Sequence, residues 1–202
     1  MLKVYHYEDK TATLALEKAL KELNQKEEDL LIKTSEIQGK LFKSKKYELE
    51  IIVKEDISRE IKSFVKELGN KMNLDIQVEV SEKDEIYSVL LVSDNNAILI
   101  GKDGKTLNAV QLLLKQVLNN NHNFNIKINL DVANYKNKKI RSFEYEIKKI
   151  AKEVLNTKVE VKLDPMNSYE RRIVHTIVSE FEELETESIG EEPNRYVVIK
   201  FK

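Results

Sequence analysis

The stretch from Ala97 to Asn120, AILIGKDGKTLNAVQLLLKQVLNN, decides how the rest of the chain is arranged. It consists of an apolar rise, a short turn bracketed by Gly101 and Gly104, and a predicted helix. Glycine has no Cβ and tolerates positive φ, so a Gly-x-x-Gly turn lets another backbone come close. The helix is indicated by apolar residues at the spacing of a core-facing helix: Leu107, Val110, Leu114, Val117 and Leu118.

The elements around this turn have the order of a KH domain. Apolar periodicity predicts a helix over 57–68, closed by Gly69 as its C-cap residue, and strands over 74–80 and 86–92. A further strand is expected over 125–132. The resulting order, α-β-β-α-α-β, resembles the second, bacterial type of KH domain. In such a domain the phosphates of a single strand lie against the turn and the start of the helix after it.

A P-loop is the alternative reading of the same turn, because Gly104-Lys105-Thr106 is also the end of G-x-x-x-x-G-K-[ST]. The first glycine of that motif is replaced by Leu99. A P-loop enzyme also needs several parallel strands that alternate with helices, whereas a long helix and a small α+β pattern follow Asp131. An NTPase is therefore a distant third hypothesis, and we expect no enzyme and no cofactor.

Composition narrows the functional classes further. A hydrophobic fraction of 41% permits packed cores. The chain has no cysteine, its three histidines are scattered, and no apolar run resembles a signal peptide or a membrane span. We therefore expect a cytoplasmic protein without a metal site. The net charge is -1, but residues 101–149 hold ten Lys or Arg against four Asp or Glu. This positive block begins at the Gly-x-x-Gly turn and favours a nucleic-acid ligand.

A small module precedes the KH-like segment. A strand over 3–7, a helix over 13–23, and strands over 30–37 and 47–53 give a β-α-β-β pattern. The lysine-rich loop over 39–46 either docks a polyanion or partner or is an ordinary charged hairpin loop, the second reading being favoured.

A third module begins with a helix over 134–155, whose polar side carries Lys136, Lys138 and Lys139. Tyrosines lie among these lysines, as on a surface that stacks unpaired bases, although a solvated connecting helix needs similar residues. A strand over 158–163 follows, and strands over 184–189 and 196–201 end the module.

Arg171 and His175 lie four residues apart on the helix between these strands, so they share one face, which we expect to be its polar face. Asn167 and Glu170 predict a capping box at its start. Both side chains can donate to a phosphate, the histidine best when protonated, so binding is expected to tighten towards pH 6. The alternative is that His175 bonds a nearby carboxylate.

These residues together resemble the bacterial Jag, or SpoIIIJ-associated, proteins, which join a small N-terminal domain to a KH domain and an Arg-x-x-x-His domain. The most specific matches are residues 163–175, LDPMNSYERRIVH, and 185–196, ETESIGEEPNRY, and the turn at 101–107 is similar too. The resemblance implies a protein that binds single-stranded RNA or DNA, is not an enzyme, and acts in post-transcriptional regulation linked to cell elongation and division. It also implies a small free-standing KH protein as a partner.

Two departures from that family are visible. Asp103 lies where the loop is usually basic, and its carboxylate is expected to repel a phosphate. Only Gly39-Lys40-Leu41-Phe42 remains of the glycine-rich signature in the N-terminal domain.

We therefore predict an α+β protein of three modules: an N-terminal domain over 1–54, a type II KH domain over 55–133, and an Arg-x-x-x-His domain with its connecting helix over 134–202. It is expected to bind single-stranded RNA rather than DNA, with homo-oligomerisation open; the alternative is a protein-protein scaffold. Aspartates at both loop glycines are expected to remove binding and leave the fold largely intact. The predicted binding residues are Gly101, Lys102, Asp103, Gly104, Lys105, Thr106, Lys136, Lys138, Lys139, Arg171, Arg172 and His175.

Overall fold

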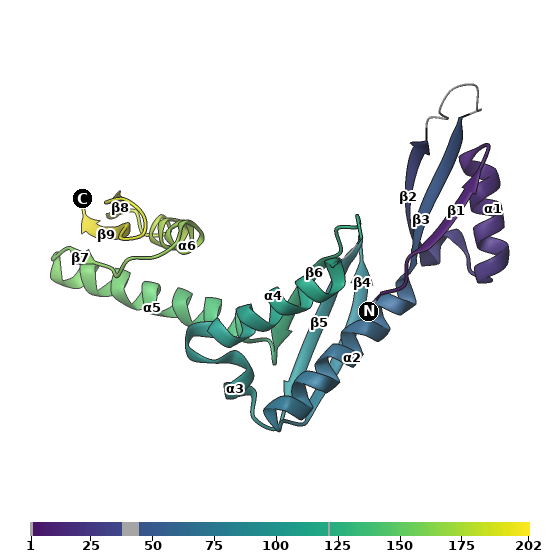
Figure 1. The fold of residues 1–202 in the computed structure, drawn as a ribbon. Helices are drawn as coiled ribbons and strands as arrows, with labels where there is room; N and C mark the ends of the chain where they lie inside the picture. Colours follow the sequence, from purple (N-terminus) through teal and green to yellow (C-terminus); the bar gives the residue numbers. More distant parts are fainter. Residues whose placement is uncertain (1, 38–44, 121) are drawn as a thin grey trace. The chain divides into compact units, whose positions relative to one another are not determined.

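The computed structural model describes residues 2–37, 45–120 and 122–202, and it divides into two compact units, Met1–Ala133 and Asn134–Lys202 (Figure 1). Each unit combines helices with three-stranded sheets, which confirms the predicted α+β class. The boundary predicted inside the first unit, near residue 54, stays a prediction. Below, each unit is described by itself.

The N-terminal part of the first unit is a sheet of order β1-β3-β2 with one helix. Strand β3 (Lys46–Val53) pairs antiparallel with both β1 (Tyr5–Asp9) and β2 (Leu30–Ile37). Helix α1 (Ala12–Leu23) begins at Thr11, whose Oγ1 accepts a hydrogen bond from the Leu14 amide at 3.3 Å. The small residues of α1 are fully buried and allow close packing on the sheet. The lysine-rich loop predicted at 39–46 lies outside the described residues except for its last two positions.

The rest of the first unit has the predicted order of elements, which are α2 (Lys54–Met72), β4 (Ile76–Lys83), β5 (Ile86–Ser93), α3 (Asn96–Ile100), α4 (Lys105–Asn119) and β6 (Lys127–Val132). The central strand β5 pairs antiparallel with β4 and parallel with β6. A parallel pair needs a crossover, and here α3, the glycine turn and α4 supply it. Helices α2 and α4 pack against this sheet, and the glycine turn joins α3 to α4 (Figure 1).

The prediction that Gly69 ends α2 is wrong. The helix continues to Met72, and Asn73 ends it with a left-handed backbone at φ 54°. Gly69 instead lies where the chain returns after the helix, because its carbonyl accepts from the Leu74 amide at 2.9 Å. A Cβ at Gly69 would lie 2.9 Å from the Leu74 carbonyl oxygen, so glycine is required for this approach.

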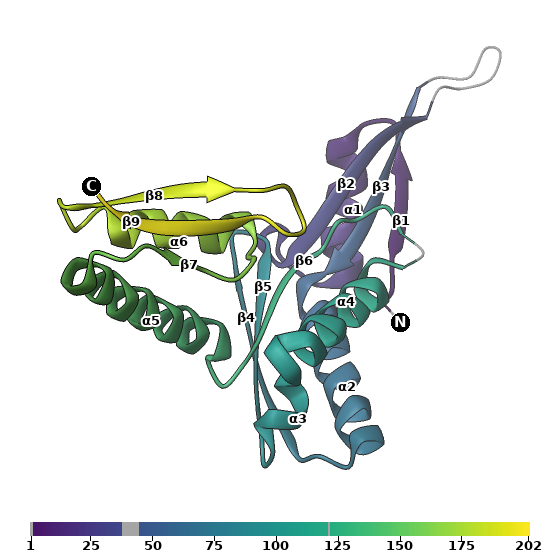
Figure 2. The same ribbon diagram turned by 90° about the vertical axis from the view of Figure 1, so that its left-hand side faces the viewer.

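The second unit packs two helices against a sheet of order β7-β9-β8 (Figure 2). Its elements are α5 (Tyr135–Thr157), β7 (Val161–Lys162), α6 (Ser168–Val178), β8 (Leu184–Ile189) and β9 (Tyr196–Phe201). The strand predicted over 158–163 is shorter than expected because α5 runs to Thr157 and Lys158 ends it at φ 58°. The core of the unit contains the apolar residues predicted for α5 and α6, including Ile147, Val154, Val174 and Ile177.

Candidate nucleic-acid interface

The glycine turn has a backbone that only a few residue types adopt. Gly101 has φ 69° and ψ -178°, a region open essentially to glycine alone. Asp103 (φ 56°, ψ 19°) and Gly104 (φ 84°, ψ 15°) are both left-handed. A Cβ at Gly101 would lie 2.1 Å from Oγ1 of Thr106, so the turn packs tightly against the first turn of α4.

The side chains of this turn are arranged around the start of α4. Lys102, Asp103 and Lys105 are exposed, Thr106 is half-buried, and Gly104 is buried. Helix α4 begins at Lys105, so the unsatisfied amides and the positive dipole end of its first turn lie next to two exposed ammonium groups. This combination is suited to an anion such as a backbone phosphate.

The helix before the turn argues against a P-loop. In a P-loop the glycine-rich turn follows a strand. Here the segment before the turn is the short helix α3, and Leu99, at the place of the first P-loop glycine, is buried in the core. The helix-turn-helix order is that of a KH domain.

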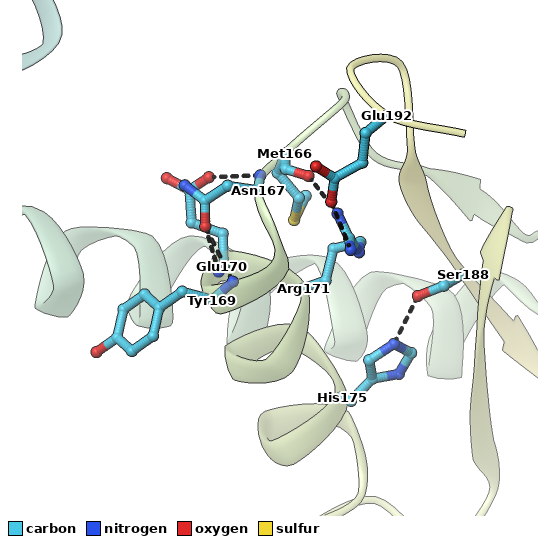
Figure 3. Close-up of polar contacts among 8 residues, drawn as sticks. All are labelled: Met166, Asn167, Tyr169, Glu170, Arg171, His175, Ser188 and Glu192. Atoms are coloured by element: carbon cyan, nitrogen blue, oxygen red, sulfur yellow. Dashed lines mark hydrogen bonds and ion pairs between the residues drawn. The ribbon is translucent and has the colours of Figure 1, made fainter. Parts of the chain in front are cut away.

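The start of α6 has the predicted capping box, which is drawn in Figure 3. Oδ1 of Asn167 accepts hydrogen bonds from the amides of Tyr169 and Glu170, both at 3.0 Å. In return, Oε2 of Glu170 accepts from the Asn167 amide at 3.2 Å. The first turn of α6 is therefore held in place, and with it the backbone that carries Arg171.

Arg171 does not lie on a solvent-facing side of α6, so that expectation is wrong. The residue is 8% exposed. Its Nη1 donates to the Met166 carbonyl at 2.8 Å, and its Nη2 donates to Oε1 of Glu192 at 3.1 Å (Figure 3). Helical spacing shows that Arg171 and His175 share a face, but the loop between β8 and β9 approaches that face at Arg171.

His175 is engaged through both ring nitrogens. Nδ1 lies 2.6 Å from Oγ1 of Thr186, and Nε2 lies 2.8 Å from Oγ of Ser188. The partners are two hydroxyls of β8, and not the carboxylate considered above. Burial, and then the charge of Arg171, lower the pKa of His175. Protonation is thereby moved below the ordinary range, which weakens the expectation that binding tightens as the pH falls to 6.

The lowered pKa of His175 predicts a pH dependence of stability. The unfolded chain takes up its proton near the ordinary pKa of 6.5, before the folded chain does, so acid favours unfolding. The stabilisation is complete above that pH and is lost as the pH falls through it towards the lower folded pKa. We expect the free energy of unfolding to decrease between about pH 7 and about pH 5, measured by urea denaturation. His175→Gln should show a smaller decrease; equal slopes for both proteins would contradict a neutral, buried imidazole.

The remaining predicted residues lie at separate places. Lys138, Lys139 and Arg172 are exposed and Lys136 is half-buried. The three lysines belong to the beginning of α5, ahead of Phe143, the first α5 residue packed against the core of the second unit. The glycine turn belongs to the first unit. A joint site of the lysines with Arg171 therefore stays a prediction.

Glu192 is the residue of this region that sequence reasoning missed. It contacts Arg171 across 21 positions of sequence, so no local periodicity indicates the pair. The available signal was the acidic dipeptide Glu191-Glu192 in a loop of the second unit, inside a stretch that stands out only for its family resemblance.

Comparison with known proteins agrees with this geometry. Residues 58–131 match the model of the KhpA/KhpB KH domain, and residues 144–201 match the model of the Arg-x-x-x-His domain. The RNA-binding protein KhpB of Clostridium symbiosum is 38% identical over 151 residues, which cover 74% of this chain and 68% of that protein. The chain belongs to the KhpB family. This is the Jag family whose resemblance the motifs indicated, so that prediction is confirmed.

Other relatives match less of their own length. KhpB of Bacillus subtilis strain 168 is 35% identical over 130 residues, 63% of this chain and 62% of that protein. The chain thus spans less than two thirds of that relative. A putative 3'-5' exonuclease of Acanthamoeba polyphaga mimivirus is 39% identical over 62 residues, only 15% of its length. This short match covers the size of one domain and does not extend to the body of the viral protein.

Proposed function

We propose that this chain binds single-stranded RNA through the glycine turn of residues 101–106, without enzymatic activity. The observation that carries the proposal is the backbone of the turn, which removes side-chain bulk at Gly101 and Gly104 and places Lys102 and Lys105 beside the start of α4. The relatives named RNA-binding protein KhpB support it. An RNA backbone lying along this turn would contact amides and ammonium groups without base recognition.

The second unit is proposed to supply further phosphate contacts. Arg172 is exposed on α6, and the largely buried Arg171 keeps 10% of its side chain exposed. With His175, Lys136, Lys138 and Lys139, these groups are the proposed second contact region. Because phosphate contacts position a strand without reading it, their loss should weaken binding about equally for all sequences.

Replacement of Asp103 tests the proposed site. Asn tolerates the left-handed backbone that Asp103 adopts at φ 56° and removes its negative charge. We expect Asp103→Asn to tighten binding of a single-stranded uridine oligonucleotide about threefold and to steepen the dependence of log K on log salt, measured by filter binding.

The matched control is Asp84→Asn. Asp84 is also exposed and left-handed, at φ 52°, but lies on the turn between β4 and β5. It changes the net charge equally, so an equal effect of both variants would show that charge acts from a distance. If the wild-type chain binds neither RNA nor DNA at low salt, the proposed function is wrong.

A protein-protein scaffold is the second candidate function, and one observation favours it. Helix α4 turns apolar side chains outward, with Leu112 57%, Leu113 50% and Val117 37% exposed. Such a ridge suits a protein partner. We propose that it takes the small free-standing KH protein implied by the family, or a second copy of the chain. Binding of RNA and of a partner at these different places is compatible.

The cellular role is proposed from the family. We infer a cytoplasmic protein of post-transcriptional regulation linked to cell elongation and division. Within the described ranges, no helix has the length and apolar character needed to cross a membrane. The same residues include no group of three or more acidic or histidine side chains suited to a metal ion.

A further inference from the structure

Glu192 places its carboxylate at the point where an anion can reach Arg171. Its Oε1 accepts from Nη2 of Arg171 at 3.1 Å, while Nη1 is bound to the Met166 carbonyl. The side chain of Arg171 is 10% exposed, whereas that of Glu192 is 65% exposed. A nearly buried cation therefore meets a counterion that approaches it from the solvent side (Figure 3).

We propose that Glu192 occupies the phosphate position of Arg171, and that a phosphate of single-stranded RNA binds there by displacing it. This inference rests on the proposed function. A phosphate oxygen accepts the same charge-assisted N–H···O bond as a carboxylate oxygen. Binding at Arg171 is then an exchange of one anion for another, and Glu192 lowers the affinity of the site until it is displaced.

The loop that carries Glu192 is held by contacts that do not involve its carboxylate. The Asn194 amide donates to the Glu191 carbonyl at 2.9 Å, and the Met166 amide donates to the Arg195 carbonyl at 3.0 Å. The Glu192 side chain can therefore rotate into solvent while the loop backbone stays in place. Arg171 would also keep its position, because the Met166 carbonyl and the capped start of α6 hold it.

The neighbouring groups leave Arg171 as the cation that holds Glu192. His175, one turn further along α6, directs both ring nitrogens to the hydroxyls of Thr186 and Ser188. A single, replaceable ion pair at the mouth of a buried guanidinium is a geometry in which an incoming phosphate gains what the carboxylate loses. An exposed loop glutamate with no such contact would have no effect of this kind.

The test compares Glu192→Gln with Glu191→Gln in the full chain. Both changes remove one negative charge from the same loop, and Glu191 is exposed beside Glu192. The probe is a single-stranded uridine oligonucleotide, titrated by fluorescence anisotropy at several salt concentrations. We expect Glu192→Gln to bind about threefold more tightly than Glu191→Gln, as for the loss of one competing ion pair. Its salt slope should be steeper by about 0.7, because a further phosphate is neutralised without release of a carboxylate.

Each other outcome overturns the inference. Equal affinity of the two variants would mean that charge acts only from a distance, and weaker binding by Glu192→Gln would mean that Glu192 positions Arg171 for its ligand. If Glu192→Gln does not fold, as judged by its thermal unfolding, Glu192→Asp carries the test. This change keeps the charge but withdraws the carboxylate by one methylene, so tighter binding than wild type supports displacement and unchanged binding overturns it. Failure of the wild-type chain to bind the probe at any salt overturns the proposed function and this inference together, whereas wild-type binding with equal variants overturns the inference alone.

Discussion

Replacement of Gly101 by alanine is expected to destabilise the first unit by about 2 to 4 kcal/mol, because two penalties add. The backbone at φ 69° and ψ -178° is unfavourable for any residue with a Cβ. The added Cβ would also lie 2.1 Å from Oγ1 and 2.8 Å from Cβ of Thr106, so the start of α4 has to move. Urea denaturation of the full chain measures the loss of stability.

The two penalties can be separated by a second substitution. Thr106→Ala removes the oxygen that the new Cβ would meet, so the double variant Gly101→Ala with Thr106→Ala should recover part of the lost stability. The part that it does not recover is the backbone penalty. A Gly101→Ala protein that unfolds at the wild-type urea concentration would show that the turn does not have this geometry.

RNA binding should be lost with the geometry of the turn. We expect Gly101→Ala to weaken binding about tenfold or more, since the amides and the two lysines at the start of α4 would no longer be held together. Aspartates at both glycines would disturb the turn in the same way. The expectation that such a double variant leaves the fold largely intact is therefore corrected, and Asp103→Asn is the cleaner test of charge.

Replacement of Arg171 by alanine is expected to destabilise the second unit by about 2 to 4 kcal/mol. Arg171 is nearly buried, and its loss leaves the Met166 carbonyl without the bond at 2.8 Å and Glu192 without its counterion. The carbonyl lies directly ahead of the capping box, so the start of α6 should loosen. Thermal unfolding of the full chain, followed by circular dichroism, measures the effect.

Arg172→Ala is the matched control for Arg171→Ala. It removes the same type of side chain one position further along α6, but from an exposed site. We expect its stability to stay within about 0.5 kcal/mol of wild type, while RNA binding weakens by about one phosphate contact. If the two variants are equally stable, Arg171 has no structural role, and the contacts to Met166 and Glu192 are incidental.

Local patterns in the sequence were sufficient for most of the elements. Strands β2, β8 and β9 have the predicted bounds, and the capping box of α6 joins the predicted pair of residues. These features depend on residues within one helical turn or on strict alternation, so the interactions that produce them lie close together in the chain. The motif of the glycine turn, together with the order of elements around it, was enough to indicate the family.

Features that depend on distant segments were decided only by the tertiary structure. Helical spacing placed Arg171 and His175 on one face, but the loop that meets Arg171 comes from 21 residues away, and so the face is buried there instead of solvated. Gly69 resembled a helix end until the returning chain at Leu74 showed why a side chain is excluded. Likewise, the two hydroxyls that bind His175 come from β8, and their approach, with burial, lowers its pKa. A sequence pattern specifies which residues share a face, whereas burial and charge depend on what covers that face, and the covering segment is brought there only by packing of the whole unit.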